Sequence, residues 1–390
     1  MQKSHRLFMK KFLLVYEFAD RMGKKNGHDP LWDFSRDVLL QKFAERGKTL
    51  KFSVARGIFK KHQDGGTSAK RLANFFYMHA AVLFEYLSKR PDVVFVRTTP
   101  PLIQIPYLFF GKLFGAKVYV WLMDYHPVFG LRSSKKGSPK YFVWKFFDIL
   151  DRLALKLAAG VVCLDTAMSE LIRERSPKTK TFVCPTFSLK KVDFLDLSNP
   201  REKVDTVSLL YSGNLGRAHN TEKLEKFLSA LSKKTEVELA FSGMSDKSAA
   251  RLAAVCEASG AHFKRFPFVK NYADLGAFYK KNGFDYGIVL LNDELRGVVS
   301  PSKFSGYSSF GLPVINIGPK GTNADTLCER FGAGISFDDV SEIDAVIERI
   351  LNPATQPELA RNTKNSLEYF SPKAAERLAD FWLSELDSKA

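Results

Sequence analysis

Short apolar runs rich in Val, Ile and Phe alternate along the chain with longer amphipathic stretches. In the first half we expect strands at KFLLVYEFA, LKFSVAR, DVVFVRTT, AKVYVWLMD, GVVCLD and KTFVCPT. Helical stretches such as Ser68–Arg90 and Tyr141–Ala159 lie between these runs. Apolar strands separated by helices are typical of parallel sheets with crossover connections. The first half is therefore expected to be a doubly wound α/β domain.

A charged, proline-containing segment, Leu189–Asp205, separates this half from a second half in which the pattern restarts. There the runs TVSLLYSGNLG, VELAFSG, FKRFPFV, FDYGIVLL and LPVINIG alternate with expected helices near residues 220–233, 247–259, 273–281 and 323–331. We predict an α/β chain of two tandem Rossmann-like, doubly wound domains that face each other across a cleft. The predicted parts are an N-terminal domain (1–190), a linker (191–205), a C-terminal domain (206–370) and a terminal helix (371–390), for which packing back on the N-terminal domain is one option.

A glycine-rich turn, LLYSGNLGRAHN, follows the first expected strand of the second half. Gly213 and Gly216, with Asn214 between them, would let the backbone approach a ligand closely, and Arg217 would offer a forked contact to phosphate. As an ordinary strand-to-helix turn the same sequence would need no ligand, and Arg217 would be a solvated surface charge.

The stretch SPSKFSGYSSFG follows another strand of that half, FDYGIVLL. Ser300 is typical of an N-cap and Pro301 of a first helical residue, so Ser302 and Lys303 would lie in the first turn. A helix start of this kind favours an anion. Because both turns come at strand ends of one sheet, we expect Arg217 and Lys303 to converge on one diphosphate; the alternative is that both are solvated charges.

Two polar side chains follow a strand of the first half in VWLMDYHPVFG. Asp124 or His126 could act there as a base or orient a substrate hydroxyl. In the structural interpretation, Asp124 only caps the loop.

One helical stretch of the first half, YFVWKFFDILDRLALKLAA, is strongly amphipathic. Helical spacing places Lys145, Arg152 and Lys156 on one narrow face, opposite a wide aromatic and aliphatic face. Such a helix could pack on a sheet, or it could lie at a bilayer surface with its lysines reaching lipid headgroups.

The net charge of +17 lies entirely in the first half. Residues 1–200 contain 35 Lys and Arg against 17 Asp and Glu, whereas residues 201–390 contain 24 against 25. A basic half suits nucleic acid, an anionic membrane face or a phosphorylated ligand, and it could also serve solubility alone. The aromatic residues stand mostly in apolar runs rather than between exposed basic residues, so we expect no nucleic-acid partner.

Several classes of chemistry lack their sequence signatures. The four cysteines form no CxxC pair, and the chain contains no HExxH, DxD, GxSxG or Walker sequence. We therefore expect no metal site, no serine-hydrolase chemistry and no P-loop chemistry. The N-terminal apolar run FLLVYEF is too short for a signal peptide or a membrane span, so we expect a cytoplasmic protein with reduced thiols.

The order and spacing of the second-half motifs resemble a known family. LLYSGNLGRAHN, VELAFSG, FPFV and SPSKFSGYSSFGLPVINIG are similar to the second domain of glycosyltransferase family 4 enzymes of GT-B fold, over Val207–Phe337. The first half resembles that family only in strand order and in DYHPV, which is similar to an Asp-x-x-Pro loop of bacterial surface-polysaccharide members. The resemblance implies transfer of a sugar from a nucleoside-diphosphate sugar, expected to be UDP-linked, with retention at the anomeric carbon and without a divalent metal or other cofactor.

The resemblance also implies roles for matching positions. The turn Gly213–Gly216 with Arg217, together with Lys303 and the backbone at Ser300 and Ser302, would neutralise the donor diphosphate. Phe268 and Val269, in the loop Phe266–Val269, would hold the nucleobase edge by backbone contacts. Many members carry two glutamates in this region, and this chain has Val298 and Gly306 at those positions.

The sequence thus predicts a retaining glycosyltransferase of bacterial surface-polysaccharide synthesis, peripheral at the inner face of the cell membrane. Its acceptor is expected to be a lipid-linked saccharide, and the basic first half would face the anionic membrane. Asp124, His126, Arg217 and Lys303 are the candidate catalytic residues. The alternatives are a nucleotide-sugar epimerase of the same fold and a non-catalytic protein that binds nucleic acid or polysaccharide.

Overall fold

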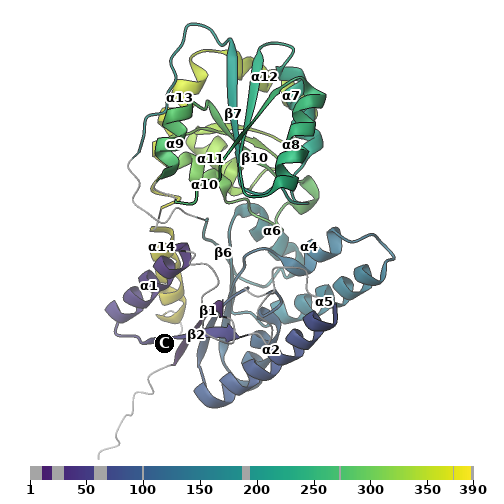
Figure 1. Ribbon diagram of the computed structural model, residues 1–390. Helices are drawn as coiled ribbons and strands as arrows, with labels where there is room; N and C mark the ends of the chain where they lie inside the picture. Colours follow the sequence, from purple (N-terminus) through teal and green to yellow (C-terminus); the bar gives the residue numbers. More distant parts are fainter. Residues whose placement is uncertain are drawn as a thin grey trace, which may run out of the picture. The chain divides into compact units, whose positions relative to one another are not determined.

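A computed structural model of the chain describes residues 11–19, 30–56, 68–98, 101–186, 194–271, 274–371 and 373–387 (Figure 1). The first part of the predicted linker, residues 191–193, lies outside this described part. The chain divides into two compact units. Unit 1 comprises Met1–Cys163, Ser169–Cys184 and Ala375–Ala390, and unit 2 comprises Leu164–Met168 and Pro185–Ala374.

Unit 1 is built on a parallel sheet of order β2-β1-β3-β4-β5-β6. Leu14 of β1 pairs with Phe52 of β2 on one side and with Phe95 of β3 on the other. β3 is buried along its whole length, which explains why its sequence is a continuous apolar run rather than an alternating one. The strands are β1 (Phe12–Ala19), β2 (Leu50–Arg56), β3 (Val93–Arg97), β4 (Lys117–Trp121), β5 (Gly160–Cys163) and β6 (Thr181–Val183).

Helices connect these parallel strands, as crossover connections require. They are α1 (Pro30–Glu45), α2 (Ser68–Lys89), α3 (Gln104–Phe114), α4 (His126–Arg132), α5 (Pro139–Leu155) and α6 (Thr166–Arg175). The chain closes with α14 (Lys373–Asp387), most of which belongs to unit 1. Trp382 of α14 is fully buried and stacks on Phe95, with 4.2 Å between the ring centroids. Phe381 stacks in the same way on Phe182 of β6, at 4.3 Å.

A buried polar network joins α5 to its neighbours in unit 1. Arg175, at the end of α6, lies 2.5 Å from Asp148 and 3.9 Å from Asp151. Asp151 is fully buried; it accepts hydrogen bonds from the Tyr125 hydroxyl and, over 3.0 Å, from the Gln104 amide. Burial raises the pKa of Asp151, and its hydrogen bonds and Arg175 act in the opposite direction. The network makes the inward face of α5 polar.

The outward face of α5 is apolar. Phe142, Phe146 and Ile149 are 58%, 56% and 50% exposed, and Leu153 is also exposed. The sequence allowed the wide apolar face of this helix to pack on a sheet, and for these side chains that interpretation is wrong. They point to solvent because the buried positions of the helix include Asp148 and Asp151, whose partners hold that side inward.

Unit 2 has a parallel sheet of order β12-β11-β10-β7-β8-β9. Its strands are β7 (Thr206–Ser212), β8 (Glu236–Ser242), β9 (His262–Phe266), β10 (Tyr286–Leu290), β11 (Val314–Ile317) and β12 (Gly334–Phe337). Its helices are α7 (Thr221–Leu231), α8 (Asp246–Ser259), α9 (Asp274–Asn282), α10 (Lys303–Ser308), α11 (Asn323–Phe331), α12 (Ile343–Leu351) and α13 (Thr355–Ser366).

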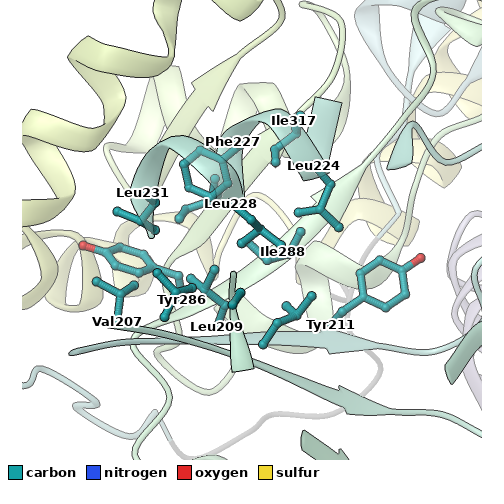
Figure 2. Packing of buried hydrophobic residues seen from close by; sticks show 14 of the residues in the cluster. Val207, Leu209, Tyr211, Leu224, Phe227, Leu228, Leu231, Tyr286, Ile288 and Ile317 are labelled. Carbon is teal, nitrogen blue, oxygen red and sulfur yellow. The ribbon is translucent and has the colours of Figure 1, made fainter. Parts of the chain in front are cut away.

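Both faces of this second sheet are covered by helices. Leu209 and Tyr211 of β7 pack with side chains of α7 (Figure 2), in a core that α8 and α12 also enter. Leu210 between them packs with α10 and α11. Successive strand residues therefore enter separate cores on opposite faces, as in a doubly wound sheet. Each unit is thus a parallel sheet with flanking helices, which confirms the predicted fold class of two tandem Rossmann-like domains.

Candidate functional site

The strand order of unit 2 places a topological switch point between β7 and β10. From β7 the chain winds outward to β8 and β9 on one side and continues through β10, β11 and β12 on the other. In sheets of this kind, ligands bind beyond the carboxyl ends of the strands at such a point. The turn after β7 begins at Gly213 and the segment after β10 leads to Lys303, so both predicted anion-binding segments leave the sheet there.

The turn after β7 is fixed by backbone contacts. Gly213 has a φ of 92°, which side-chain-bearing residues rarely adopt, and its amide donates to the Ser242 carbonyl over 2.8 Å. The Leu215 amide donates to the Ser248 hydroxyl over 3.0 Å. The Asn292 amide, after β10, donates to the Ala218 carbonyl over 2.8 Å, so the segments after the two strands are joined directly.

Tyr307 fixes the position of α10 beneath the same strands. Its hydroxyl oxygen accepts a hydrogen bond of 2.7 Å from the Ser212 amide at the end of β7. A Cβ atom on Gly287 of β10 would lie 2.4 Å from the Tyr307 ring, so glycine at that position makes room for the aromatic side chain. The tyrosine thereby fixes the position of Lys303, the first residue of α10.

The expected start of α10 at Pro301 is wrong. The helix begins at Lys303, not at Pro301, and Ser302 rather than Ser300 is the N-cap, without a side-chain capping bond. Ser300 is buried and accepts a hydrogen bond of 3.1 Å from the Asn323 amide, so its side chain is committed elsewhere. Because α10 is only 6 residues long, Lys303 itself carries the electrostatic argument at this position.

The Lys303 side chain lies over the glycine turn. Its Nζ atom is 2.9 Å from Nε2 of His219 and 4.9 Å from the centroid of the Tyr211 ring. A Cβ atom on Gly213 would stand 3.3 Å from its Cε atom. Burial lowers the pKa of Lys303 to about 8, because removal from water disfavours the ammonium form. The structure therefore brings Gly213 and Lys303 together, as the sequence predicts for one anion site.

The other residues of unit 2 that the sequence predicts to bind the donor diphosphate are exposed, apart from the buried Ser300. Asn214, Gly216 and Arg217 are exposed in the same turn, and Asn214 accepts a hydrogen bond of 3.1 Å from the Tyr211 hydroxyl through its carbonyl. Ser302 is also exposed. Convergence of Arg217 and Lys303 on one diphosphate remains a prediction.

The predicted nucleobase loop follows β9, at the edge of the sheet. Phe268 is exposed and Val269 half-buried. The loop is tied to the end of β8 by the Ser242 hydroxyl, which donates to the Pro267 carbonyl over 3.1 Å. It thus starts from a fixed point beside the switch-point strands.

Asp124 lies in unit 1 between β4 and α4, and His126 is the first residue of α4. Nδ1 of His126 is 3.0 Å from the Asp124 carbonyl oxygen, so the two residues are in contact. The Asp124 carboxyl reaches the surface but is surrounded by protein atoms; this burial raises its pKa, and His126 acts in the opposite direction. A catalytic role for the two residues remains a prediction.

Three residues of the site received no role from the sequence. Tyr211, His219 and Tyr307 respectively form the ring under Lys303, its closest side-chain partner and the anchor of its helix. His219 stands inside the glycine-rich motif GRAHN, and its place there was the available signal. The two tyrosines contact residues that are distant in the sequence, Lys303 and Ser212, and a pattern along the chain does not reveal such contacts.

Two features are absent from the described part of the chain. It contains no cluster of three His, Cys, Asp or Glu side chains that could hold a metal ion. In the same residues, every helix is too short or too polar to cross a membrane.

Comparison of the whole chain with known proteins finds likeness in structure but not in sequence. No family model and no curated protein sequence matches. Sucrose-phosphate synthase from Thermosynechococcus elongatus and the lipopolysaccharide outer core galactosyltransferase WaaB each superpose with a TM-score of 0.65, at 13% and 12% identity, over 97% of this chain and 100% of theirs. HepE from Anabaena, in complex with UDP and glucose, superposes with a TM-score of 0.56 at 13% identity, over 96% of this chain and 99% of its own. The chain therefore has the GT-B fold, the two-domain architecture of glycosyltransferases.

Proposed function

We propose that this protein is a retaining glycosyltransferase that moves a sugar from a UDP-sugar to a lipid-linked saccharide in bacterial surface-polysaccharide synthesis. The observation that carries the proposal is the position of Lys303, held over Gly213 at the switch point of the unit 2 sheet. Structures with the same fold support the choice of donor, since HepE has been crystallised with UDP and glucose and with UDP-glucose.

A diphosphate suits the charges at this point. The glycine turn lets the backbone come close to phosphate oxygens, and Lys303 and Arg217 supply positive charge from α10 and from the turn itself. In a retaining transfer the bond between the sugar and the diphosphate breaks. The anomeric carbon becomes oxocarbenium-like while negative charge grows on the leaving phosphate. Fixed positive charge that stabilises this leaving group lowers the barrier, so the reaction requires no metal ion.

The acceptor side of the proposal is supported by unit 1. Helix α3 packs against both α2 and α5, and all three helices carry exposed apolar side chains. We call this set the outer face: Phe76, Phe84, Leu87, Phe109, Leu113, Phe114, Phe142, Val143, Phe146, Ile149 and Leu153. Exposed aromatic and aliphatic residues of this extent suit a bilayer surface, where a lipid-linked acceptor would be met.

The exposed charged residues of α5 are all basic. On α5 the exposed charged residues are Lys140, Lys145 and Arg152, and Lys156 follows at the helix end. The two acids of this helix, Asp148 and Asp151, are buried. Arg152 is paired with Asp148 over 3.1 Å, so Lys140, Lys145 and Lys156 are the charges of this segment that would meet anionic headgroups.

Calorimetric titration with UDP tests the donor site. Lys303→Ala and Arg217→Ala are each expected to weaken UDP binding about ten- to a hundredfold, because each removes a charge-assisted hydrogen bond to phosphate. Lys280→Ala, an exposed lysine on α9, is the matched control and is expected to bind UDP as the unaltered protein does. Unchanged UDP affinity in both site variants would remove the diphosphate site.

Product analysis then separates the proposal from its closest alternative. A set of UDP-sugars is incubated with the protein and a polyprenyl-diphosphate saccharide, and the products are identified by mass spectrometry and NMR. A transferase releases UDP and lengthens the acceptor with the anomeric configuration retained. An epimerase acting on the same UDP-sugar would change the sugar without using the acceptor, and that outcome would overturn the proposal.

A further inference from the structure

Tyr125 stands between the two candidate residues of unit 1, Asp124 and His126. It is fully buried, whereas Asp124 is exposed and His126 half-buried. Tyr125 is also the N-cap of α4, and its carbonyl accepts from the Phe129 amide over 2.9 Å. Ser, Thr, Asp and Asn are preferred at an N-cap because their short side chains bond to the first helical amides. The Tyr125 side chain makes no such bond, so its contacts outside the helix explain its position.

The Tyr125 hydroxyl is held between two helices. It donates to the carboxyl group of Asp151 on α5 and accepts from Nε of Arg175, at the end of α6, over 2.7 Å. The guanidinium also lies 5.0 Å from the centroid of the tyrosine ring. Gln104 of α3 donates in turn to Asp151 over 3.0 Å, and Arg175 is held 2.5 Å from Asp148. With one donor and one acceptor bond, the hydroxyl has a fixed place in this buried network.

Helix α4 rests on the helix that supplies Asp151. A Cβ atom added to Gly130 of α4 would lie 2.1 Å from the Trp144 ring of α5, so the α4 backbone lies directly on the indole. Trp144 and Asp151 stand about two helical turns apart and therefore project from one side of α5. That side fixes α4 at two points, Gly130 and Tyr125.

The strand side of the turn before α4 is anchored separately. The Met123 amide donates to the Thr98 hydroxyl over 2.8 Å, and the Thr98 amide donates to the Trp121 carbonyl over 3.0 Å. Asp124 thus stands between two anchored residues, Met123 and Tyr125. The place of its carboxyl group is therefore set by bonds that lie outside the turn itself.

We infer that Tyr125 is the positioning residue of the turn Met123–His126, which we call the acceptor turn. The bonds of its buried hydroxyl fix the backbone through which Asp124 and His126 are placed to act on an acceptor hydroxyl. The inference rests on the proposed function and on the predicted part of these two residues in it. Tyr125 does not touch the acceptor, because its side chain is buried; it acts through its two neighbours. In a reaction that depends on alignment, a displacement of about 1 Å costs on the order of a hundredfold in rate.

Tyr125→Phe tests the inference, because it keeps the ring and removes only the hydroxyl. With a UDP-sugar and a polyprenyl-diphosphate saccharide, kcat is expected to fall about ten- to a hundredfold as the acceptor turn shifts. The KM for the UDP-sugar and the calorimetric affinity for UDP are expected to stay unchanged, since the proposed donor site belongs to unit 2. A fall in kcat without loss of donor binding distinguishes positioning of the acceptor turn from general unfolding.

Tyr86→Phe is the matched control. Tyr86 is another buried tyrosine of unit 1, and its hydroxyl donates to the Tyr107 carbonyl of α3 over 2.9 Å. This variant also loses a buried hydrogen bond, but it is expected to keep the kcat of the unaltered protein. Hydrogen–deuterium exchange should show lost protection over residues 123–129 for Tyr125→Phe alone, while urea unfolding records the stability of both variants.

Two substitutions of Asp151 separate the hydrogen bond from the charge. Asp151→Asn removes the charge but keeps an oxygen atom that accepts from the Tyr125 hydroxyl, so kcat is expected to stay near that of the unaltered protein. Asp151→Leu accepts no hydrogen bond, so kcat is expected to fall as it does in Tyr125→Phe. Rescue by the amide and not by the apolar side chain would assign the effect to the bond.

The outcomes for the inference and for the proposed function differ. Unchanged kcat in Tyr125→Phe, an equal fall in Tyr86→Phe, or equal falls in the two Asp151 variants would overturn the inference and leave the proposed function standing. A fall in kcat with no change of exchange in the acceptor turn would overturn it too, since the hydroxyl would then act other than by positioning. Absence of sugar transfer by the unaltered protein, with every UDP-sugar tried, would overturn both.

Discussion

Gly213 combines two roles at the carboxyl end of β7. Its positive φ turns the chain away from the sheet, and its missing side chain leaves the space that the Lys303 stem occupies. One glycine thus serves both the backbone of the turn and the packing of the charged residue above it. Gly216, in the same turn, serves neither purpose: its φ is not positive, and an added Cβ would have its nearest neighbour at 3.8 Å.

We therefore predict different outcomes for alanine at these two glycines. Gly213→Ala is expected to cost about 1–3 kcal/mol of stability through backbone strain, and to weaken UDP binding by displacing Lys303. Gly216→Ala should leave the stability nearly unchanged. Urea unfolding and UDP calorimetry on the two variants measure this difference. Equal behaviour would show that neither the strain nor the lysine contact acts as described.

Prediction from sequence reached Gly213 and Lys303 but missed the partner between them. The glycine turn and the lysine each have a local signature, and both follow strands whose ends meet at one edge of the sheet. His219 stands in the same motif as the glycine turn, but its place there does not reveal its role, which depends on a contact with a residue far along the chain. Ser300 failed as an N-cap for a similar reason: Asn323 engages its hydroxyl from another helix.

At the scale of the element, α5 reverses the usual placement of polar and apolar side chains. Its acids face inward, where Arg175, Tyr125 and Gln104 satisfy them, and its aromatic residues Phe142 and Phe146 face outward. Helical periodicity placed the basic residues opposite the apolar ones, whereas in the structure both Lys145 and Phe146 are exposed. Periodicity could not decide which side is buried, because that choice depends on the partners Gln104, Tyr125 and Arg175.

The outer face makes a prediction for this helix. With vesicles containing anionic phospholipid, the protein is expected to sediment, and replacement of Phe142, Phe146 and Ile149 by serine is expected to release most of it by removing the inserted apolar area. Substitution of Lys145, Arg152 and Lys156 by glutamate should also release it, and added salt should weaken binding of the unaltered protein.

A change of equal charge in unit 2 is the control for vesicle binding. Lys226, Lys280 and Lys281 are exposed lysines of unit 2, and their replacement by glutamate alters the net charge as much as the α5 substitutions do. This variant is expected to sediment with vesicles. Release of both charge variants alike, together with retention of the serine variant, would mean that net charge alone drives adsorption and that α5 has no special part.

At the scale of the whole molecule, unit 1 is assembled from separated parts of the chain. The sequence runs through unit 1, builds nearly all of unit 2 and then returns to unit 1 in α14. Strand and helix patterns were sufficient to predict the two doubly wound sheets, since each element has its own periodicity. The aromatic contacts that hold α14, between Trp382 and Phe95 and between Phe381 and Phe182, join residues too distant in sequence for any pattern to relate.

Removal of the Trp382 ring is predicted to destabilise unit 1 selectively. Trp382→Ala should cost about 3–5 kcal/mol, because a fully buried aromatic side chain leaves a cavity. Hydrogen–deuterium exchange should then show lost protection in β3 and β4 and unchanged protection in β7 and β10. Ser384→Ala, at an exposed position of the same helix, is the control. An equal loss in both units would contradict the separate role of α14.

The return of the chain in α14 also fixes an order of events during synthesis on the ribosome. Unit 2 ends at Ala374, so all of its residues are translated before the part of α14 that belongs to unit 1, and folding of unit 2 does not wait for that part. The sheet of unit 1 emerges first, yet it lacks the covering of Phe95 and Phe182 until α14 is made. The earlier-made unit is therefore the later to mature, and its uncovered rings are the surface that a chaperone would meet during translation.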